Sequence, residues 1–512
     1  MNKSIISLFA AVCMVFGQAN AQKKVTSKKP NIVIIISDDH AFQAIGAYGG
    51  KLMPTPGIDR IANEGMVMQN AFVSNSICGP SRACILTGKH SAANGFKDNL
   101  SKFDASQDVF VRRLQGVGYQ TAWVGKWHLE STPQGFDFWN ILVGQGYYYN
   151  PDFIQMDGSV KRMEGYVTDL TTDIAEGWLE KRDKDKPFCL VVGQKATHRV
   201  WMPDLQDLGK FDKENFALPT NFYDNYEDRY AAAMQDMNIE KSMRLGYDLK
   251  IMQGLDMGRE NLTRLNANQK KTYTDYYKGI EKEFISKNLS GKALTEWKYQ
   301  RYMKDYLSTA VSLDRNVGRL MDYLDENGLK ENTLVIYMSD QGFYLGEHGW
   351  FDKRFMYEES FKTPMIIRYP GVIKPGTVNK DMVMNIDIAP TALELAGIKI
   401  PKEIHGQSML PLFQNKKKQV RDAVYYHYFE FGEHNVIPHF GVRTERYKLI
   451  RFYKGADKWE LYDLQTDPRE MRNLIYDPSY AGIRKELRTR LTELVTAYKD
   501  GDAAQILSAD KE

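Results

Sequence analysis

The stretch NIVIIISDDH (31–40) joins a continuous, β-branched apolar run to three polar side chains. Two later stretches repeat this design, FCLVVGQKATH (188–198) and TLVIYMSDQG (333–342). An apolar run without alternation is typical of a strand that is buried on both faces of a parallel sheet. In open α/β sheets the functional site lies beyond the carboxyl ends of such strands. The sequence therefore predicts an α/β fold with its site residues at these three strand ends.

The segments between and after these strands predict the domain organisation. In 302–324 apolar residues recur at intervals of three and four, which predicts a helix that stops near Gly328. The polar region of about 226–300, rich in Met and Tyr, indicates a mostly helical insertion. After about 412, short strand-like runs and a closing helix indicate a small α+β subdomain. We expect a main domain at 31–412, which contains the insertion, and a subdomain at 413–512.

The N-terminus predicts export. Lys3 precedes an apolar run that ends near Ala19-Asn20-Ala21, so residues 1–21 are interpreted as a cleaved signal peptide and 22–30 as a linker. The apolar run is shorter than the roughly 20 residues that span a bilayer, and we expect no stable membrane insertion. We favour a bacterial periplasm as the destination over a lipid anchor at Cys13 or release outside the cell.

Charge and cysteine content exclude two classes of protein. The 512 residues include 68 basic and 65 acidic side chains, a net charge of +3, so we expect no nucleic-acid partner. Cleavage of the signal peptide would leave Cys78, Cys84 and Cys189. An odd and small number of cysteines argues against a disulfide framework even in an exported protein.

The neighbours of Cys78 carry the strongest functional signal. In SICGPSRACILTGKH (76–90), every fixed position of the pattern C-x-P-S-R-x-x-x-L-T-G is present, and GYQTAWVGKWH (118–128) follows. These two stretches resemble the two signatures of the formylglycine-dependent type I sulfatases. The resemblance extends from the first strand to the C-terminal subdomain, apart from the insertion. It implies an alkaline-phosphatase-like α/β sandwich with a mostly parallel central sheet, in which 31–412 is the catalytic domain.

The same resemblance implies a modified residue. A sulfatase-maturing enzyme would oxidise Cys78 to formylglycine, whose hydrated aldehyde has two hydroxyls. One hydroxyl would attack sulfur and the other would later eject sulfate, which divides a difficult reaction into two easier steps. Arg82 would orient this nucleophile. Taken alone, Cys78 would more readily be interpreted as a buried thiol, and only the surrounding motif reverses that interpretation.

Oxygen ligands at two strand ends predict a calcium site. Asp38, Asp39, Asp340 and Gln341 provide hard oxygen donors, and modified residue 78 would complete the set together with a sulfate oxygen. The family usually has Asn or Asp at position 341. Glutamine keeps the carbonyl oxygen but adds a methylene group.

The resemblance also assigns the sulfate-binding and proton-transfer residues. Lys126 and Lys353 would bind sulfate oxygens. His128 would remove a proton from the hydroxyl of residue 78, and His198 would protonate the departing alcohol, which suits a side chain with an unperturbed pKa near 6.5. The family often has Pro before this second histidine, where this sequence has Thr197. His40 is interpreted as a supporting residue behind the Asp pair.

Two further stretches resemble the N-acetylglucosamine-6-sulfatase branch. They are DKRFMYEE (352–359) and GQGYYYNPDF (144–153). The resemblance implies a sulfated saccharide substrate, such as 6-O-sulfated N-acetylglucosamine in a glycosaminoglycan or mucin glycan. Asp352 and Arg354 flank Lys353 and would contact the sugar: from a loop both can face the ligand, whereas in a strand they would share a face opposite Lys353. Three further residues are candidates for the pocket wall: His348, His434 and His439.

Three alternatives remain open from the sequence. The enzyme could act on another sulfated sugar position. A phosphonate monoester or phosphodiester hydrolase can share the formylglycine signature. A glycan-binding protein without activity would result if Cys78 is never oxidised.

Overall fold

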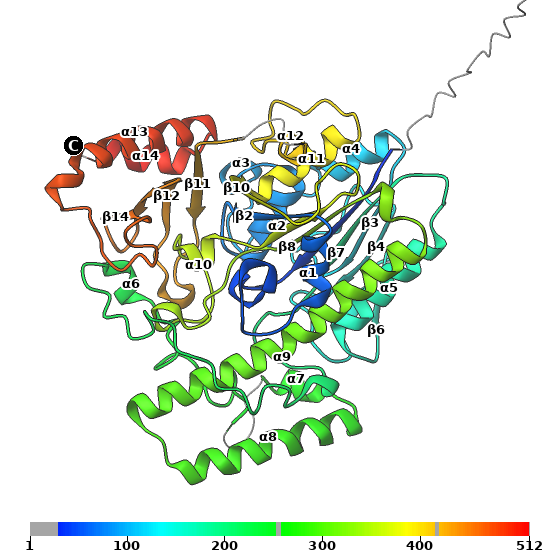
Figure 1. Ribbon diagram of the computed structural model, residues 1–512, viewed down its shortest axis with the longest axis horizontal. Helices are drawn as coiled ribbons and strands as arrows, with labels where there is room; N and C mark the ends of the chain where they lie inside the picture. Colours follow the sequence, from blue (N-terminus) through cyan, green and yellow to red (C-terminus); the bar gives the residue numbers. More distant parts are fainter. Residues whose placement is uncertain (1–28, 252–257, 415–418, 511–512) are drawn as a thin grey trace, which may run out of the picture.

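The computed structural model describes residues 29–251, 258–414 and 419–510, and its centre is a ten-stranded sheet (Figure 1). The strands lie in the order β10-β2-β9-β8-β1-β7-β3-β4-β5-β6. Most neighbours are parallel, whereas β9 is antiparallel to β2 and β8, and β5 is antiparallel to β4 and β6. Their bounds are β1 (Asn31–Ser37), β2 (Met66–Phe72), β3 (Gln120–Gly125), β4 (Phe138–Leu142), β5 (Asp152–Ile154), β6 (Val160–Arg162), β7 (Phe188–Gly193), β8 (Thr333–Ser339), β9 (Met365–Arg368) and β10 (Thr377–Met384).

The three apolar runs form adjacent strands, as predicted. β1 pairs in parallel with β7 on one side and with β8 on the other. Ile32, Ile34 and Ile36 pack into one hydrophobic cluster, and Val33 and Ile35 pack into the cluster on the opposite face. Burial on both faces explains why the β1 sequence shows no polar alternation.

Helices cover both faces of the sheet, which completes the α/β sandwich. The side chains of α2 (Cys78–Thr87), α4 (Phe110–Gly116) and α11 (Ile388–Leu395) pack on one face. Those of α1 (Pro56–Asn63), α5 (Val167–Lys181) and the second half of α9 (Gly291–Glu326) pack on the other. The helix predicted at 302–324 is thus the later part of the 36-residue α9, and its end lies just before Gly328, which has a left-handed φ of 66°. Among the described residues of this part, the remaining short α-helices are α3 (Ser91–Asn94), α10 (Glu358–Phe361) and α12 (Leu410–Phe413).

The region predicted as a helical insertion combines helices with turns. It contains α6 (Tyr230–Met234), α7 (Gly258–Arg264), α8 (Ala267–Lys287) and the first residues of α9, whereas 235–251 forms turns. The helix α8 and the first half of α9 extend away from the sheet at the bottom of Figure 1. The domain boundaries derived from the sequence stay predictions.

The C-terminal part is an α+β unit, as expected. Its antiparallel sheet has the order β11-β12-β13-β14, formed by β11 (Ala423–Tyr428), β12 (His439–Thr444), β13 (Tyr447–Phe452) and β14 (Lys458–Asp463), and is covered by α13 (Ala481–Ala497) and α14 (Gly501–Ala509). The Tyr426 hydroxyl accepts a hydrogen bond of 3.2 Å from the Ser76 N–H and donates to the Arg354 carbonyl. This sheet therefore holds both the segment before Cys78 and the segment around Lys353.

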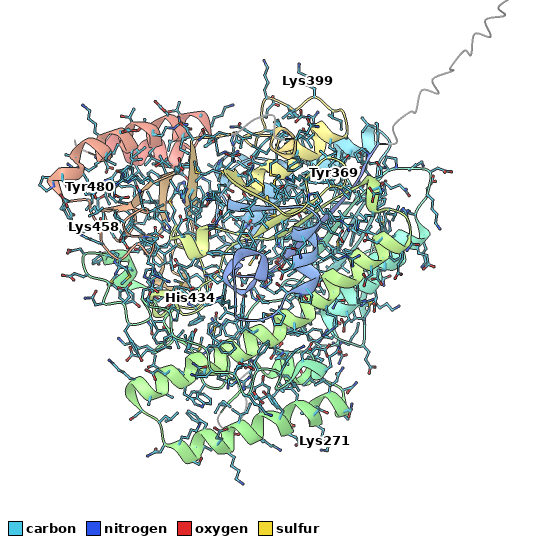
Figure 2. All side chains as sticks on the ribbon, in the orientation of Figure 1. Lys271, Tyr369, Lys399, His434, Lys458 and Tyr480 are labelled. Atoms are coloured by element: carbon cyan, nitrogen blue, oxygen red, sulfur yellow. The ribbon has the colours of Figure 1, made fainter. Side chains whose placement is uncertain are left out.

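Side chains fill the space between the sheet and the helices (Figure 2). Cys78, Cys84 and Cys189 are buried and free, in agreement with the expected lack of a disulfide framework. Within the part of the chain that the structure describes, no helix combines the length and apolar character needed to cross a bilayer. The predicted signal peptide and the lipidation alternative at Cys13 lie outside the described residues.

Candidate functional site

Three polar strand ends meet at one edge of the central sheet. Asp38 and Asp39 follow β1, His198 follows β7 and Asp340 follows β8. A backbone hydrogen bond of 3.0 Å from the Asp340 N–H to the Ser37 carbonyl ties two of these segments together. The edge predicted from the sequence is therefore formed, and its polar side chains are close neighbours.

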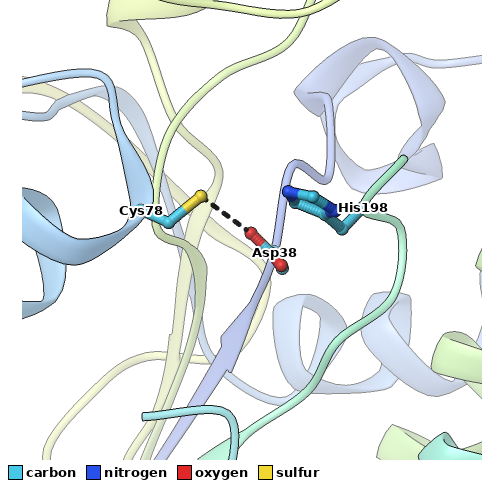
Figure 3. Close-up of side chains that lie close together, drawn as sticks. All are labelled: Asp38, Cys78 and His198. Atoms are coloured by element: carbon cyan, nitrogen blue, oxygen red, sulfur yellow. Dashed lines mark hydrogen bonds between the residues drawn. The ribbon is translucent and has the colours of Figure 1, made fainter. Parts of the chain in front are cut away.

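Cys78 is the first residue of α2 and points toward Asp38 (Figure 3). Its side chain is buried, and Sγ donates a hydrogen bond of 3.3 Å to Asp38 Oδ1. Burial, together with the Asp38 carboxylate, raises the pKa of the Cys78 thiol to about 12. Such a thiol is protonated at neutral pH, whereas the thiolate is the nucleophilic form. The unmodified cysteine is therefore poorly suited to attack a sulfate ester.

Two buried lysines pair with the two carboxylates after β1. Lys126 Nζ donates to Asp38 Oδ2, and Lys353 Nζ donates to Asp39 Oδ2 at 2.7 Å. All four side chains are at most 5% exposed. An ammonium group has three donors, so each lysine keeps donors for an anion that binds beside these carboxylates.

Arg82 connects the helix of Cys78 to two strand ends. It lies one turn after Cys78 and is fully buried. Its Nε and Nη2 are 3.0 and 2.9 Å from Asp340 Oδ2, and its Nη1 donates to the Lys126 carbonyl at 2.8 Å. Both contacts fall on one carboxylate oxygen, so Arg82 makes a single hydrogen bond and an ion pair to Asp340; together with the bond to the Lys126 carbonyl, they fix the start of α2 relative to the carboxylates.

Three buried carboxylates converge in a way that favours a bound cation. Oxygens of Asp38, Asp39 and Asp340 lie within 4.8 Å of one another. Burial, and next the nearby Asp38 charge, raise the pKa of Asp340 to about 7, although Arg82 and Lys126 lie close to it. Gln341 lies beside them, with its Nε2 donating to Asp39 Oδ1 at 2.5 Å, and its side-chain oxygen has no partner among the described residues. A rotation of this amide would turn the oxygen toward a bound cation. Carboxylate and amide oxygens fit a hard ion such as calcium better than zinc.

The two predicted acid–base histidines lie at this site in neutral form. His198 Nδ1 is 2.5 Å from the Arg199 carbonyl, and His128 Nε2 is 3.0 Å from Gln145 Nε2. Burial holds the pKa of both imidazoles well below the usual value. A neutral His128 can accept a proton, as its expected role requires. The proton of a neutral His198 lies on Nδ1, which faces the Arg199 carbonyl, so Nε2 must first take up a proton before His198 can protonate an alcohol.

His40 supports the first strand end, as expected. It is fully buried, its backbone N–H donates to Ser339 Oγ at 2.9 Å, and its Nδ1 is 2.5 Å from the Tyr337 hydroxyl. Burial lowers the pKa of His40 to about 3. The residue therefore acts as a neutral link between β1 and β8.

The side chains of the segment around Lys353 make two separate sets of contacts. The segment is a loop, in which Asp352 and Arg354 both have left-handed φ values of 77° and 101°. Lys353 reaches Asp39, whereas Arg354 Nη1 donates to Asp352 Oδ1 at 2.5 Å. Asp352 Oδ2 is also 3.1 Å from His434 Nε2. The structure thus groups three of the predicted sugar-binding residues beside the lysine that faces the carboxylates.

Comparisons with known families identify this arrangement. A family profile described as "Sulfatase" matches residues 30–398. The chain belongs to the sulfatase family. A second profile, described as "N-sulphoglucosamine sulphohydrolase, C-terminal", matches residues 346–497 of this sulfatase.

Relatives of the sulfatase cover nearly its full length. It is 48% identical over 516 residues to the N-acetylglucosamine-6-O-sulfatase of Bacteroides thetaiotaomicron, with 98% of this chain and 92% of that protein covered. A solved structure, described as a complex with its substrate D-glucosamine-2-N,6-O-disulfate, is 48% identical with a TM-score of 0.90 and covers 93% of this chain and 99% of that one. The fold class and the sulfuric ester hydrolase activity predicted from the motifs are confirmed.

The fold of this chain also resembles that of a solved hydrolase with low sequence identity. The phosphonate monoester hydrolase of Agrobacterium radiobacter superposes with a TM-score of 0.68 at 19% identity, over 92% of this chain and 96% of that one. This likeness concerns the architecture alone.

Two residues of the site were not singled out from the sequence. Lys195 is buried, donates to the Gln145 carbonyl at 3.0 Å, and has its pKa lowered to about 7 by burial and by the charge of Lys126. The Gln145 side chain contacts His128. A signal for both was present, because Lys195 directly follows a buried strand and Gln145 lies in the GQGYYYNPDF stretch.

Two of the predicted pocket-wall histidines are instead structural. His348 is fully buried and its Nδ1 is 2.6 Å from Asp224 Oδ2. His439 is also fully buried, its Nε2 accepts from the Met356 N–H at 3.0 Å, and its Nδ1 is 2.8 Å from the Ile437 carbonyl. Neither imidazole therefore faces a ligand, and their expected contact with substrate is corrected.

Proposed function

We propose that this sulfatase removes the 6-O-sulfate of a glucosamine residue, N-acetylated or N-sulfated, free or at the non-reducing end of a glycan. The observation that carries the proposal is the grouping of Asp352, Arg354 and His434 beside Lys353. Support also comes from the activity for which the Bacteroides relative is named and from the substrate in the similar solved structure. We further propose export with removal of residues 1–21. A mature protein that still carries these residues would contradict the cleaved signal peptide.

Residue 78 is proposed to be the site of the nucleophile. After oxidation by a maturing enzyme, a formylglycine hydrate at this position supplies a hydroxyl that is more suitable than the protonated thiol. Arg82 holds the start of α2 against Asp340, so the position of residue 78 is fixed before substrate binds. His128 is proposed to take up the proton that this hydroxyl releases.

The sulfate group is proposed to bind between the two buried lysines. Lys126 and Lys353 provide point charges for the sulfate oxygens, and their burial strengthens this attraction because water screens it little. His198 is proposed to donate a proton to the departing sugar oxygen. Its imidazole is 17% exposed at the side chain, consistent with a position where the alcohol leaves.

Calcium is the proposed metal, held by Asp38, Asp39, Asp340, Gln341 and residue 78. When bound, calcium offsets negative charge on the sulfuryl oxygens. Removal of metal with a strong chelator is expected to abolish turnover, and calcium is expected to restore it better than zinc, because the donors are oxygens. The measurement is sulfate release after chelation and after addition of each ion. Full turnover after rigorous chelation would contradict the calcium site.

Sugar recognition is proposed to depend on the pair beside Lys353. Asp352→Ala and Arg354→Ala are expected to lower kcat/KM for N-acetylglucosamine-6-sulfate by about a hundredfold, but to change turnover of a small aryl sulfate far less. The reason is that contacts remote from the reacting sulfur contribute only when the sugar is present. Initial rates on both substrates test this.

Two results would reject parts of this proposal. Equal losses on both substrates would make the pair part of the general scaffold. Preference of the unaltered enzyme for a 2-O-, 3-O- or 4-O-sulfated sugar would reject the 6-O-sulfate assignment while the sulfatase activity stands.

A further inference from the structure

A second cationic group lies next to the residues proposed to bind the sugar. Arg199 directly follows His198, and its guanidinium carbon is 5.1 Å from the ring centroid of Phe351. The Phe351 ring also contacts the His434 ring at 6.0 Å, and His434 in turn contacts Asp352. Arg199 thus belongs to the same wall as the proposed sugar-binding residues, although no sequence motif marked it.

The guanidinium of Arg199 is held rigidly by one buried carboxylate. Its Nε and Nη2 donate to Asp248 Oδ1 and Oδ2 at 2.6 and 3.0 Å, and Asp248 is fully buried. This bidentate pair leaves Nη1, with two N–H donors, free of partners among the described residues. The Arg199 side chain remains 19% exposed, so solvent or a ligand can reach it.

The region predicted as an insertion contributes a second arginine to this group. Arg244 is exposed, and its guanidinium carbon is 4.2 Å from the ring centroid of Tyr247. The same Tyr247 ring lies 5.3 Å from the guanidinium carbon of Arg199. The Arg244 backbone N–H donates to Asp248 at 2.8 Å, which ties this turn to the first arginine. Two arginines and Asp248 leave a net charge of +1 in this group, and Asp352, whose charge also acts on Arg199, is paired with Arg354.

The geometry points to a second anion subsite, formed by Arg199 and Arg244, that binds an anionic group of the substrate other than the sulfate that is hydrolysed. This inference rests on the proposed function. Two sources fit, the N-sulfate of the same glucosamine and the carboxylate of a neighbouring uronic acid. Either ligand would place a sulfate or carboxylate oxygen against the free Arg199 donors. A guanidinium binds such an oxygen well through charge-assisted hydrogen bonds.

The preorganised pair explains why an arginine is suitable here. A guanidinium that is already fixed by Asp248 loses little side-chain freedom when an anion binds, so more of the interaction contributes to affinity. A role limited to holding the His198 segment in place would instead affect all substrates alike. The discriminating quantity is therefore the ratio of kcat/KM between substrates with and without the second anion.

Three substrates separate the possible outcomes. They are N-acetylglucosamine-6-sulfate, D-glucosamine-2-N,6-O-disulfate, and a disaccharide in which N-acetylglucosamine-6-sulfate is linked to a uronic acid. The double variant Arg199→Met with Asp248→Asn removes both charges together, because loss of the arginine alone would leave a buried carboxylate unpaired. In this double variant, we expect kcat/KM for a substrate with the second anion, divided by kcat/KM for N-acetylglucosamine-6-sulfate, to fall about tenfold or more. In Arg244→Ala we expect the same ratio to fall a few-fold.

The matched control is another cation of the same region. Lys271 on α8 is 78% exposed, pairs with Asp275 and lies far from His434 in Figure 2. Lys271→Ala is expected to leave all three rates unchanged. A fall for the disulfate alone assigns the subsite to the N-sulfate, and a fall for the disaccharide alone assigns it to the carboxylate.

The opposite results are equally clear. Unchanged ratios in both arginine variants would overturn the subsite and leave the proposed function standing. An unaltered enzyme that is inactive on all three sugars but active on another sulfated sugar would overturn the proposed substrate, and the subsite with it.

Discussion

Cys78→Ala is expected to reduce sulfate-ester turnover to the uncatalysed background and to leave the fold intact. The change removes the thiol on which maturation acts, so Cβ of residue 78 cannot be oxidised to the proposed aldehyde and no hydrate hydroxyl is formed. The cost in stability is expected to be on the order of 1 kcal/mol, because a single buried sulfur atom leaves a small cavity. Sulfate release and thermal unfolding of the variant test both parts. Cys78→Ser is expected to remain at background when maturation acts on cysteine.

The chain offers a matched control for this experiment. Cys84 lies on the same helix, is also buried, and contacts Ser91 Oγ at 3.5 Å and Asn94 rather than the carboxylates. Cys84→Ala removes the same atom from the same helix and is expected to keep turnover. Peptide mass spectrometry across residue 78 of the unaltered protein should show the aldehyde. Full activity of Cys78→Ala would refute the nucleophile, and an unoxidised, inactive protein would favour the glycan-binding alternative.

Much of the site was predictable because strand ends in a parallel sheet are fixed by the backbone. The apolar runs before Asp38, His198 and Asp340 predict buried strands, and parallel pairing then brings their carboxyl ends to one edge. Cys78 was assigned to the site by its signature rather than by this rule. Side-chain periodicity also predicted the second half of α9, since its apolar positions face the sheet.

The errors arose where only the three-dimensional environment decides the role of a residue. His348 and His434 both follow glycine-containing turns and have similar φ values of 57° and 51°, yet one is fully buried against Asp224 and the other reaches Asp352. Nothing in their local sequence distinguishes these outcomes. Lys195 was missed for the same reason, because a lysine after a strand is usually solvated and here burial holds it in the site.

Asp340→Ala is expected to lower kcat at least a hundredfold, the usual effect of losing preorganised charge stabilisation. Asp340 is a proposed calcium ligand, and it also accepts from the Asp39 backbone N–H at 3.2 Å and pairs with Arg82. The alanine variant would leave the buried Arg82 charge unpaired, which can cost about 3–5 kcal/mol of folding stability. Asp340→Asn separates the two effects, since the amide keeps a hydrogen-bond acceptor and nearly the same volume but removes the negative charge.

Asp387 provides the control that isolates the metal from the ion pair. It is fully buried and pairs with Arg421 at 2.5 Å, as Asp340 pairs with Arg82, but it lies outside the carboxylate cluster. Asp387→Asn is expected to lower the unfolding temperature without a comparable loss of activity per folded molecule. Asp340→Asn is expected to lose both activity and the response to added calcium. If Asp340→Asn keeps full, calcium-restorable turnover, Asp340 is not a metal ligand and its role is limited to orienting Arg82.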